Sequence, residues 1–159
     1  MATLYETDFY GWTQEQAAKL RALAASRMNT ELDLHNIAEE LEDMGRNNRA
    51  QLVNRLAELD EHLMKLAYSL LWDPRRQWRN SVAGQRYSIN KLLRKNPSLR
   101  HHIEEAMVEA HEDALRVFTD EKITHLNMSE PPGLCPFDLE DMLDDEWWPE
   151  CKAQPYAAD

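Results

Sequence analysis

Glycine and cysteine are both scarce in this chain, and no long apolar run occurs in it. With 4 glycines in 159 residues, the sequence has too few turn-forming residues for a typical all-β fold. It also contains no glycine-rich loop that could bind phosphate. No apolar stretch approaches the roughly 20 residues of a membrane span. Residues 1–9 lack the basic and apolar regions of a signal peptide. We therefore expect a cytoplasmic protein with no membrane partner.

The two cysteines, Cys135 and Cys151, are too few for a disulfide framework, and neither lies in a CxxC motif. The pair can form one disulfide, but free thiols are the expectation for a chain without an export signal. The sequence gives no support for a redox motif, a zinc knuckle or a resident cofactor.

Charge of one sign is concentrated in different thirds of the chain. The net charge is −6 over residues 1–44, +8 over 45–101 and −13 over 102–159, within a total of −11. One explanation is attraction between neighbouring antiparallel helices. The other is an anion-binding face on the central helices. Packing is favoured, because phosphate repels an acidic chain unless its basic face is well segregated.

Start signals and apolar spacing predict four helices. The first is expected over residues 14–28 with Thr13 as its cap, and the second begins at Leu34 after the cap Asp33. The dipeptides Asp73-Pro74 and Asn96-Pro97 are start signals for the third and fourth helices. Because every connection is short, neighbouring helices should be antiparallel.

The second helix is expected to run from Leu34 towards Trp72. Its inward positions are Ile37, Leu41, Met44, Leu52, Leu56, Leu59, Leu63, Leu66 and Leu70. From Leu52 onward these steps alternate between four and three residues, which is a heptad seam. An unbroken helix of that length would measure about 58 Å, so we expect a kink at Gly45, a dimer, or both.

The chain changes character near Asp120, where an acidic tail begins. Residues 130–133 predict a loop, residues 138–143 a short helix, and Trp147 and Trp148 an anchor for the tail. The predicted fold is an all-α antiparallel bundle of four to five helices. We expect one domain over 1–159, with a helical core over 13–119 and an irregular acidic tail over 120–159.

Acidic residues on the second helix form the first candidate site. Carboxylates on one helical face can bind a metal when other helices supply Glu and His, but the Glu-x-x-His spacing of di-iron bundles is missing. A solvated helix face is the simpler interpretation. The candidate polar cluster comprises Glu39, Glu40, Asp43, His62, Arg79 and Arg86. Its acids and arginines are expected to pair across the bundle, and no metal is assigned.

Arginines at the start of the third helix form the second candidate site. Arg75, Arg76, Arg79 and Arg86 surround Trp78, and basic residues interleaved with aromatics are typical of nucleic-acid surfaces. Trp78, however, begins an apolar seam, so we expect its ring to lie inside the bundle.

Several segments together resemble the domain-of-unknown-function family 29. The most specific is Glu39 to Gly45, which reads EELEDMG and ends the similar stretch from Leu32 to Gly45. The others are Tyr5 with Asp8 to Thr13, His62 to Lys65, Trp78, Gln85-Arg86, Pro97 to Leu99 and Cys135-Pro136. Two departures, Leu66 in place of Trp and His111 in place of Tyr, affect local packing. The resemblance implies an α-helical fold and no established activity.

Three functional hypotheses follow from these patterns. The first is a small non-catalytic interaction protein that forms a homo-dimer or docks a protein partner through its long leucine seam. The second is nucleic-acid or other polyanion binding through the four arginines. The third is a bundle metalloenzyme using Glu39, Asp43 and His62, which the missing ligand spacing disfavours.

Overall fold

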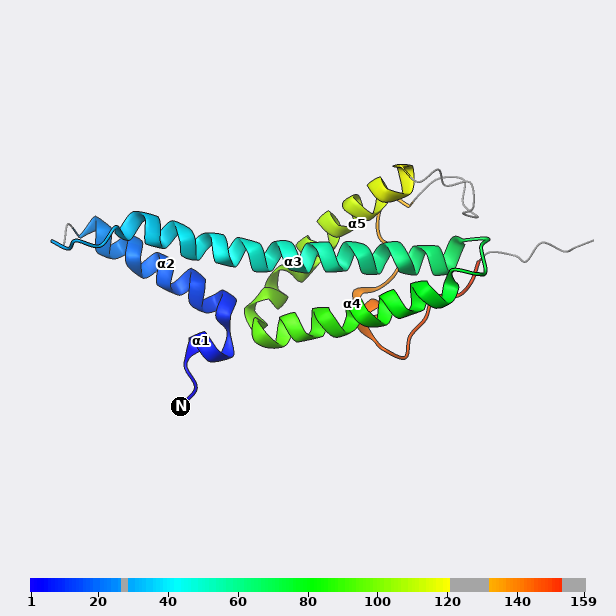
Figure 1. Ribbon diagram of the computed structural model, residues 1–159, viewed down its shortest axis with the longest axis horizontal. Coiled ribbons are helices and arrows are strands. Elements are labelled where there is room, and N and C mark those ends of the chain that lie inside the picture. Colours follow the sequence, from blue (N-terminus) through cyan, green and yellow to red (C-terminus); the bar gives the residue numbers. More distant parts are fainter. Residues whose placement is uncertain (27–28, 121–131, 153–159) are drawn as a thin grey trace, which may run out of the picture. The chain divides into compact units, whose positions relative to one another are not determined.

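Six α-helices and one 3-10 helix make up the described part of the chain, residues 1–26, 29–120 and 132–152, in a computed structural model (Figure 1). They are α1 (Leu4–Thr7), α2 (Phe9–Ala25), α3 (Leu34–Tyr68), α4 (Arg75–Lys95), η1 (Pro97–His102), α5 (Ile103–Asp120) and α6 (Leu139–Leu143). These residues include no strand, so the all-α prediction is confirmed. The expected count of four to five helices is too low, because it omits the single turn α1. None of the described helices combines the length and apolarity needed to cross a membrane.

The chain forms two compact units. The N-terminal unit contains residues 1–52 and 91–103, and the C-terminal unit contains residues 53–90 and those from 104 onward. Helices α3 and α4 each supply residues to both units. The single domain expected over 1–159 stays a prediction.

In the N-terminal unit, α2 begins earlier than predicted. Asp8 caps it, because the Asp8 Oδ1 atom accepts a hydrogen bond from the Gly11 backbone N–H at 3.1 Å. The predicted cap Thr13 is wrong: this residue is fully buried inside α2 and its hydroxyl donates to the Tyr10 carbonyl at 2.8 Å. Met28, at the end of the expected helix, lies outside the described residues.

Gly45 marks a close approach between helices and does not interrupt α3. The helix runs without a break from Leu34 to Tyr68, so Gly45 does not divide it into two helices, and the kink expected there stays a prediction. A Cβ atom added at Gly45 would lie 2.9 Å from the Thr13 Oγ1 atom of α2. The absence of a side chain therefore lets α2 pack closely against α3.

Asn96 stands at the N-cap position of the 3-10 helix η1, but its side chain makes no cap hydrogen bond and instead joins two helices of the N-terminal unit. It is 1% exposed, its Oδ1 atom accepts from the Tyr10 backbone N–H at 3.0 Å, and its Nδ2 donates to the Leu92 carbonyl at 2.9 Å. The side chain thus bonds the start of α2 to the end of α4. A six-residue 3-10 helix separates it from α5, which begins later than predicted.

The leucine seam forms the core of the C-terminal unit. Leu56, Leu59 and Leu63 are 0% exposed and Leu66 is 2% exposed, as the heptad spacing predicts. Leu70 is 41% exposed because α3 ends at Tyr68, so the expected extension towards Trp72 is wrong. Trp78 of α4 lies inside, at 8% exposure, which confirms its predicted place in a seam.

Candidate functional sites

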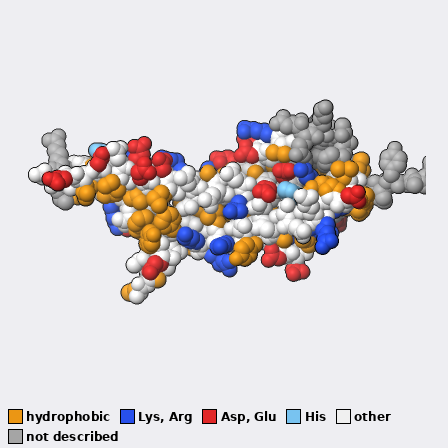
Figure 2. Space-filling view, in the orientation of Figure 1, with side chains coloured by type: hydrophobic (Ala, Val, Ile, Leu, Met, Phe, Trp, Pro, Cys, Tyr) orange, Lys and Arg blue, Asp and Glu red, His pale blue; other side chains and the backbone are white. Residues whose placement is uncertain are grey.

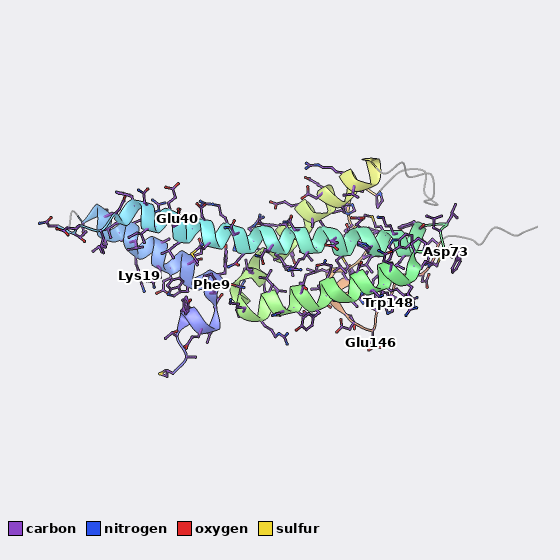
Figure 3. All side chains as sticks on the ribbon, viewed as in Figure 1. Phe9, Lys19, Glu40, Asp73, Glu146 and Trp148 are labelled. Atoms are coloured by element: carbon purple, nitrogen blue, oxygen red, sulfur yellow. The ribbon has the colours of Figure 1, made fainter. Side chains whose placement is uncertain are left out.

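The acidic half of the predicted polar cluster lies on α3 in the N-terminal unit. Glu39 and Glu40 are exposed there, with Glu40 labelled in Figure 3. Asp43 pairs with Arg46, one turn along the same helix. This acid is therefore neutralised locally, and not by an arginine of α4 as predicted.

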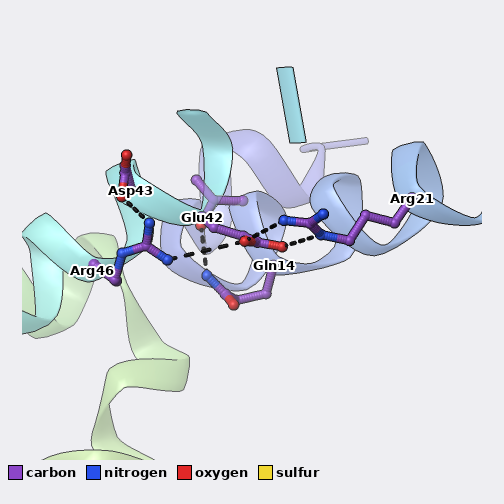
Figure 4. A network of polar contacts seen from close by, with 6 residues as sticks. Gln14, Arg21, Glu42, Asp43 and Arg46 are labelled. Carbon is purple, nitrogen blue, oxygen red and sulfur yellow. Dashed lines mark hydrogen bonds and ion pairs between the residues drawn. The ribbon is translucent and has the colours of Figure 1, made fainter. Parts of the chain in front are cut away.

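Glu42, which the prediction left out, makes the contact between helices in this region. Its two carboxylate oxygens accept hydrogen bonds from Arg21 of α2 at 2.6 and 2.8 Å, and Arg46 approaches the same group (Figure 4). The Arg21 hydrogen bond lowers the pKa of Glu42. Because Arg21 is exposed and Glu42 only half-buried, solvent screens the pair, and it fixes geometry more than it adds stability.

The other half of the predicted cluster, His62, Arg79 and Arg86, belongs to the C-terminal unit. His62 is half-buried, and its Nδ1 atom lies 2.7 Å from the Glu58 carbonyl oxygen one turn earlier. Glu39 and Asp43 belong to the other unit, so the three proposed metalloenzyme ligands are not gathered in one unit.

Arg86 is the largest fully buried side chain in the described residues. Its guanidinium donates to three backbone carbonyls of the C-terminal segment: Met142 at 2.7 Å, Trp147 at 2.8 Å and Asp145 at 3.5 Å. Burial lowers the pKa of Arg86, while the nearby charges of Asp145 and Asp144 oppose that shift, and an arginine stays charged regardless. The described tail is therefore fastened to α4 by one buried cation.

The other predicted anion-binding arginines are mostly engaged as well. Arg75 stacks on Trp72 at 5.0 Å and donates to the Leu66 and Ser69 carbonyls. Arg79 lies 5.1 Å from the ring of Trp148, which Figure 3 shows beside α4. Of the four arginines only the exposed Arg76 has no such contact among the described residues. Arg76 and Arg79 are exposed and Arg75 is half-buried, whereas Arg86 is fully buried and unavailable to a ligand at the surface.

A second polar cluster, Asp60, His111 and Cys135, lies inside the C-terminal unit. Asp60 comes from α3, His111 from α5 and Cys135 from the segment before α6, and the first two are 0% and 3% exposed. The His111 Nδ1 atom lies 2.5 Å from Asp60 Oδ2, and the Cys135 thiol donates to Asp60 Oδ1 at 3.3 Å. One donor atom from each residue lies within 4.8 Å of the other two.

The hydrogen bonds fix the protonation of this cluster. His111 Nε2 lies 2.9 Å from the Pro132 carbonyl oxygen, which can only accept, so this nitrogen carries a hydrogen. Burial alone would lower the pKa of His111, but the hydrogen bonds with Asp60 and Pro132 raise it overall. Burial, and then the Asp60 charge, raise the pKa of Cys135 to about 12.

These protonation states argue against a cysteine nucleophile. A catalytic thiol is activated by a neighbouring imidazole that lowers its pKa. Here the Cys135 thiol donates to the carboxylate of Asp60 instead of to His111, and its pKa is raised. What the cluster offers is a set of nitrogen, oxygen and sulfur donors.

A pocket of about 320 Å³ opens beside this cluster. His111 and Cys135 both line it, so the cluster is reachable from solvent. Three exposed acids, Glu104, Glu112 and Asp138, also line the pocket. Their negative charge favours the entry of cations.

An apolar groove of about 560 Å³ is the main feature of the N-terminal unit. Tyr5, Phe9 and Trp12 form its aromatic wall, with ring centroids 4.9 to 5.7 Å apart. Met44 completes the groove on α3 and is 42% exposed, and Ile37, two turns earlier, is 38% exposed. Both were predicted to face inward, and both predictions are wrong. Figure 2 shows hydrophobic side chains gathered over this part of the molecule.

The sequence prediction missed Asp60 and His111, although a signal was present. Asp60 stands four residues after Leu56 and three before Leu63, and His111 stands four after Met107 and three before Ala114. Each therefore occupies a position that the apolar spacing reserves for the interior. An acid and a base at such positions on different helices indicate a buried pair.

Comparison with known proteins finds one family and one solved structure. The family model described as "Domain of unknown function DUF29" matches residues 4–148. The crystal structure of an alpha-helical protein of unknown function from Rhodospirillum rubrum is similar, with 26% identity and a TM-score of 0.70. That likeness covers 92% of this chain and 93% of the other. No curated protein matches the chain.

Proposed function

The chain belongs to the DUF29 family, and we propose that it is a non-catalytic interaction protein that pairs with a second copy through the apolar groove of its N-terminal unit. The observation that carries this proposal is the exposed apolar stripe of α3. Ile37 and Met44 follow the same three-and-four spacing as the buried leucines, yet folding of one chain leaves them 38% and 42% exposed. Contiguous exposed apolar surface is typical of protein interaction sites.

A second copy is the occupant that the charges at the groove favour. Glu6 and Lys95 both line it. Glu6 keeps its charge, because a hydrogen bond from the Thr3 backbone N–H lowers its pKa. In a two-fold dimer the same patch meets itself, so Glu6 of one copy faces the basic side of the other. A partner of one charge sign would leave one of these two groups unmatched.

The leucine seam that first suggested association does not serve this purpose. Leu52, Leu56, Leu59 and Leu63 are 0% exposed within one chain, so they offer nothing to a partner. We therefore propose the interface in the N-terminal unit, where the exposed Ile37 and Met44 continue the apolar spacing of α3 and Met44 lines a groove.

Sedimentation of the full chain between about 1 and 100 µM, the range of weak interfaces, tests this proposal. We expect a monomer–dimer equilibrium that Met44→Glu shifts to monomer, because the new charge would have to be buried in the apolar groove that the partner covers. Tyr87→Glu, a change at an aromatic residue that is 63% exposed in the other unit, is the matched control and should leave the equilibrium unchanged. A chain that stays monomeric at 100 µM would overturn self-association and leave a different protein as the occupant. Equal effects of the two substitutions would overturn the groove as the interface.

A further inference from the structure

We propose that Asp60, His111 and Cys135 form a binding site for one zinc-class divalent ion, a role independent of the association proposed above. The three side chains come from α3, α5 and the segment before α6, so packing brings together donors that are 51 and 75 residues apart. Zinc is bound by this combination of carboxylate oxygen, imidazole nitrogen and thiolate sulfur. Magnesium and calcium prefer oxygen donors alone, so the set selects a softer metal.

The outer nitrogen of His111 is already held as in a metal site. A metal-bound histidine commonly donates its other ring N–H to a carboxylate or a backbone carbonyl, which fixes the ring. His111 Nε2 does this with the Pro132 carbonyl at 2.9 Å. Nδ1 is consequently the nitrogen that faces Asp60 and Cys135.

The charge balance of this buried cluster is compatible with a bound divalent ion. Without metal, Nδ1 of a neutral His111 and the Asp60 carboxylate would face each other with lone pairs only, so a proton lies between them and the imidazolium balances the carboxylate. A bound divalent ion replaces this proton and the Cys135 thiol proton, and both protons leave to solvent. The cluster is neutral before and after the exchange, and no uncompensated charge is buried.

The donor atoms lie within 4.8 Å of one another, and one ion would draw them together, because His111 and Cys135 contact different oxygens of Asp60. Donor atoms around a tetrahedral zinc with bonds of about 2.0 to 2.3 Å lie about 3.3 to 3.6 Å apart. The contact between the Cys135 Sγ and Asp60 Oδ1 atoms already measures 3.3 Å. The contact between His111 Nδ1 and Asp60 Oδ2 must open from 2.5 Å, which a rotation of either side chain supplies. The neighbouring pocket, lined by His111 and Cys135, leaves room for a water as fourth ligand, as in zinc sites with three protein ligands.

The test is a zinc titration of the metal-stripped full chain, by calorimetry and by competition with a chromophoric chelator. We expect one equivalent to bind with submicromolar affinity. Cys135→Ser should weaken binding by more than about 100-fold, since loss of a group that only orients a metal ligand already costs about 10- to 100-fold. Cys151→Ser, at the exposed cysteine of the same unit, is the matched control and should bind as the parent does. Equal affinity of the Cys135→Ser and parent proteins, or no binding below millimolar zinc, would overturn the proposal and leave a purely structural hydrogen-bond cluster.

Cobalt substitution keeps the proposal testable if Cys135→Ser fails to fold. Cobalt(II) in the parent chain should give an intense near-ultraviolet thiolate-to-metal charge-transfer band that the Cys151→Ser protein retains. A cobalt complex of the parent without that band would exclude Cys135 as a ligand and overturn the site.

Discussion

Replacing Arg86 by Met should be among the most damaging single changes to this chain. The substitution keeps an unbranched apolar stem but ends where the guanidinium begins, so it removes a buried cation with two short hydrogen bonds, to the carbonyls of Met142 at 2.7 Å and Trp147 at 2.8 Å. A hydrogen bond to a charged group contributes about 1.5–3 kcal/mol. Loss of both bonds, with the carbonyls left without their donor, should lower the free energy of unfolding by about 3–5 kcal/mol, as for other broken buried ionic networks.

Arg79→Met on the same helix is the matched control. Arg79 is exposed and its recorded contact is with the ring of Trp148, so its loss should cost about 0.5–1 kcal/mol. Arg86→Lys should fall between the two, because one ammonium cannot reproduce the planar fork that spans two carbonyls.

Urea unfolding followed by tryptophan fluorescence measures these differences. With a slope of about 1–3 kcal/mol per molar urea, the midpoint for Arg86→Met should fall by more than about 1 M. A midpoint that moves no further for Arg86→Met than for Arg79→Met would refute the assignment of Arg86 as the fastening of the tail.

Three further outcomes follow from other close contacts. Gly45→Ala should lower the midpoint of unfolding despite the better helix propensity of Ala, worth about 1 kcal/mol, because its Cβ atom would meet the buried Thr13 hydroxyl at 2.9 Å; a stabilised variant would show that α2 can shift away. Asn96→Ala should cost about 2–3 kcal/mol by thermal melting, since two hydrogen bonds of a residue 1% exposed are lost; a cost within 0.5 kcal/mol, roughly that of a surface change, would contradict its joining role. In the metal-free chain at pH 8, iodoacetamide with mass-spectrometric mapping should modify exposed Cys151 well before the half-buried Cys135, whose pKa is raised to about 12. Equal rates would mean that partial burial and the Asp60 charge do not keep the Cys135 thiol protonated.

Periodicity predicts the buried leucines well because the physical demand on them is repetitive. Every member of the series Leu52 to Leu66 must leave water on the same helical face, and a spacing of three and four residues specifies that face. The prediction of burial fails beyond the ends of this series, at Met44 and Leu70. There, burial depends on which other segments of the same chain cover the helix. That is a tertiary property, which the local pattern does not contain.

Buried polar residues escaped prediction for a different reason. Asp60, Arg86 and His111 each stand four residues after one apolar position and three before the next, so geometry places them inside. The sequence prediction placed neither Asp60 nor His111 in a site, and it paired Arg86 with the acids of the second helix instead of the carbonyls of the tail. Each of the three residues is stable in the interior because it bonds to a group 51 to 61 residues away. The local sequence does not identify these hydrogen-bond partners.

Gly45 of α3 is a further case in which the local sequence does not determine the role of a residue. In sequence, Gly45 has two physical meanings, a weak point in a helix or a place where another backbone comes near. Only the position of Thr13 on α2 decides between them. Thirty-two residues of chain separate the two, and the contact between them is a product of packing.

Hydrogen bonds to the helices hold the described tail residues 132–152 in place. The short helix within this segment contributes less. The five-residue α6 is too short to be stable by itself. Arg86 binds three carbonyls of the segment, Cys135 donates to Asp60, and the Lys152 backbone N–H donates to the Ala67 carbonyl at 2.7 Å. Each tie keeps the others near their partners, so their effects on attachment reinforce one another.

This coupling links the buried arginine to the proposed metal site. If Arg86→Met leaves the segment attached in only a tenth of the molecules, the apparent zinc affinity falls about tenfold, because a metal that needs Cys135 binds only the attached form. Arg79→Met should not change the affinity. Zinc should in turn restore part of the stability that Arg86→Met removes, since binding stabilises the form that carries all three ligands. Lower stability with unchanged zinc affinity would mean that Cys135 keeps its place without Arg86, and that the two networks act separately.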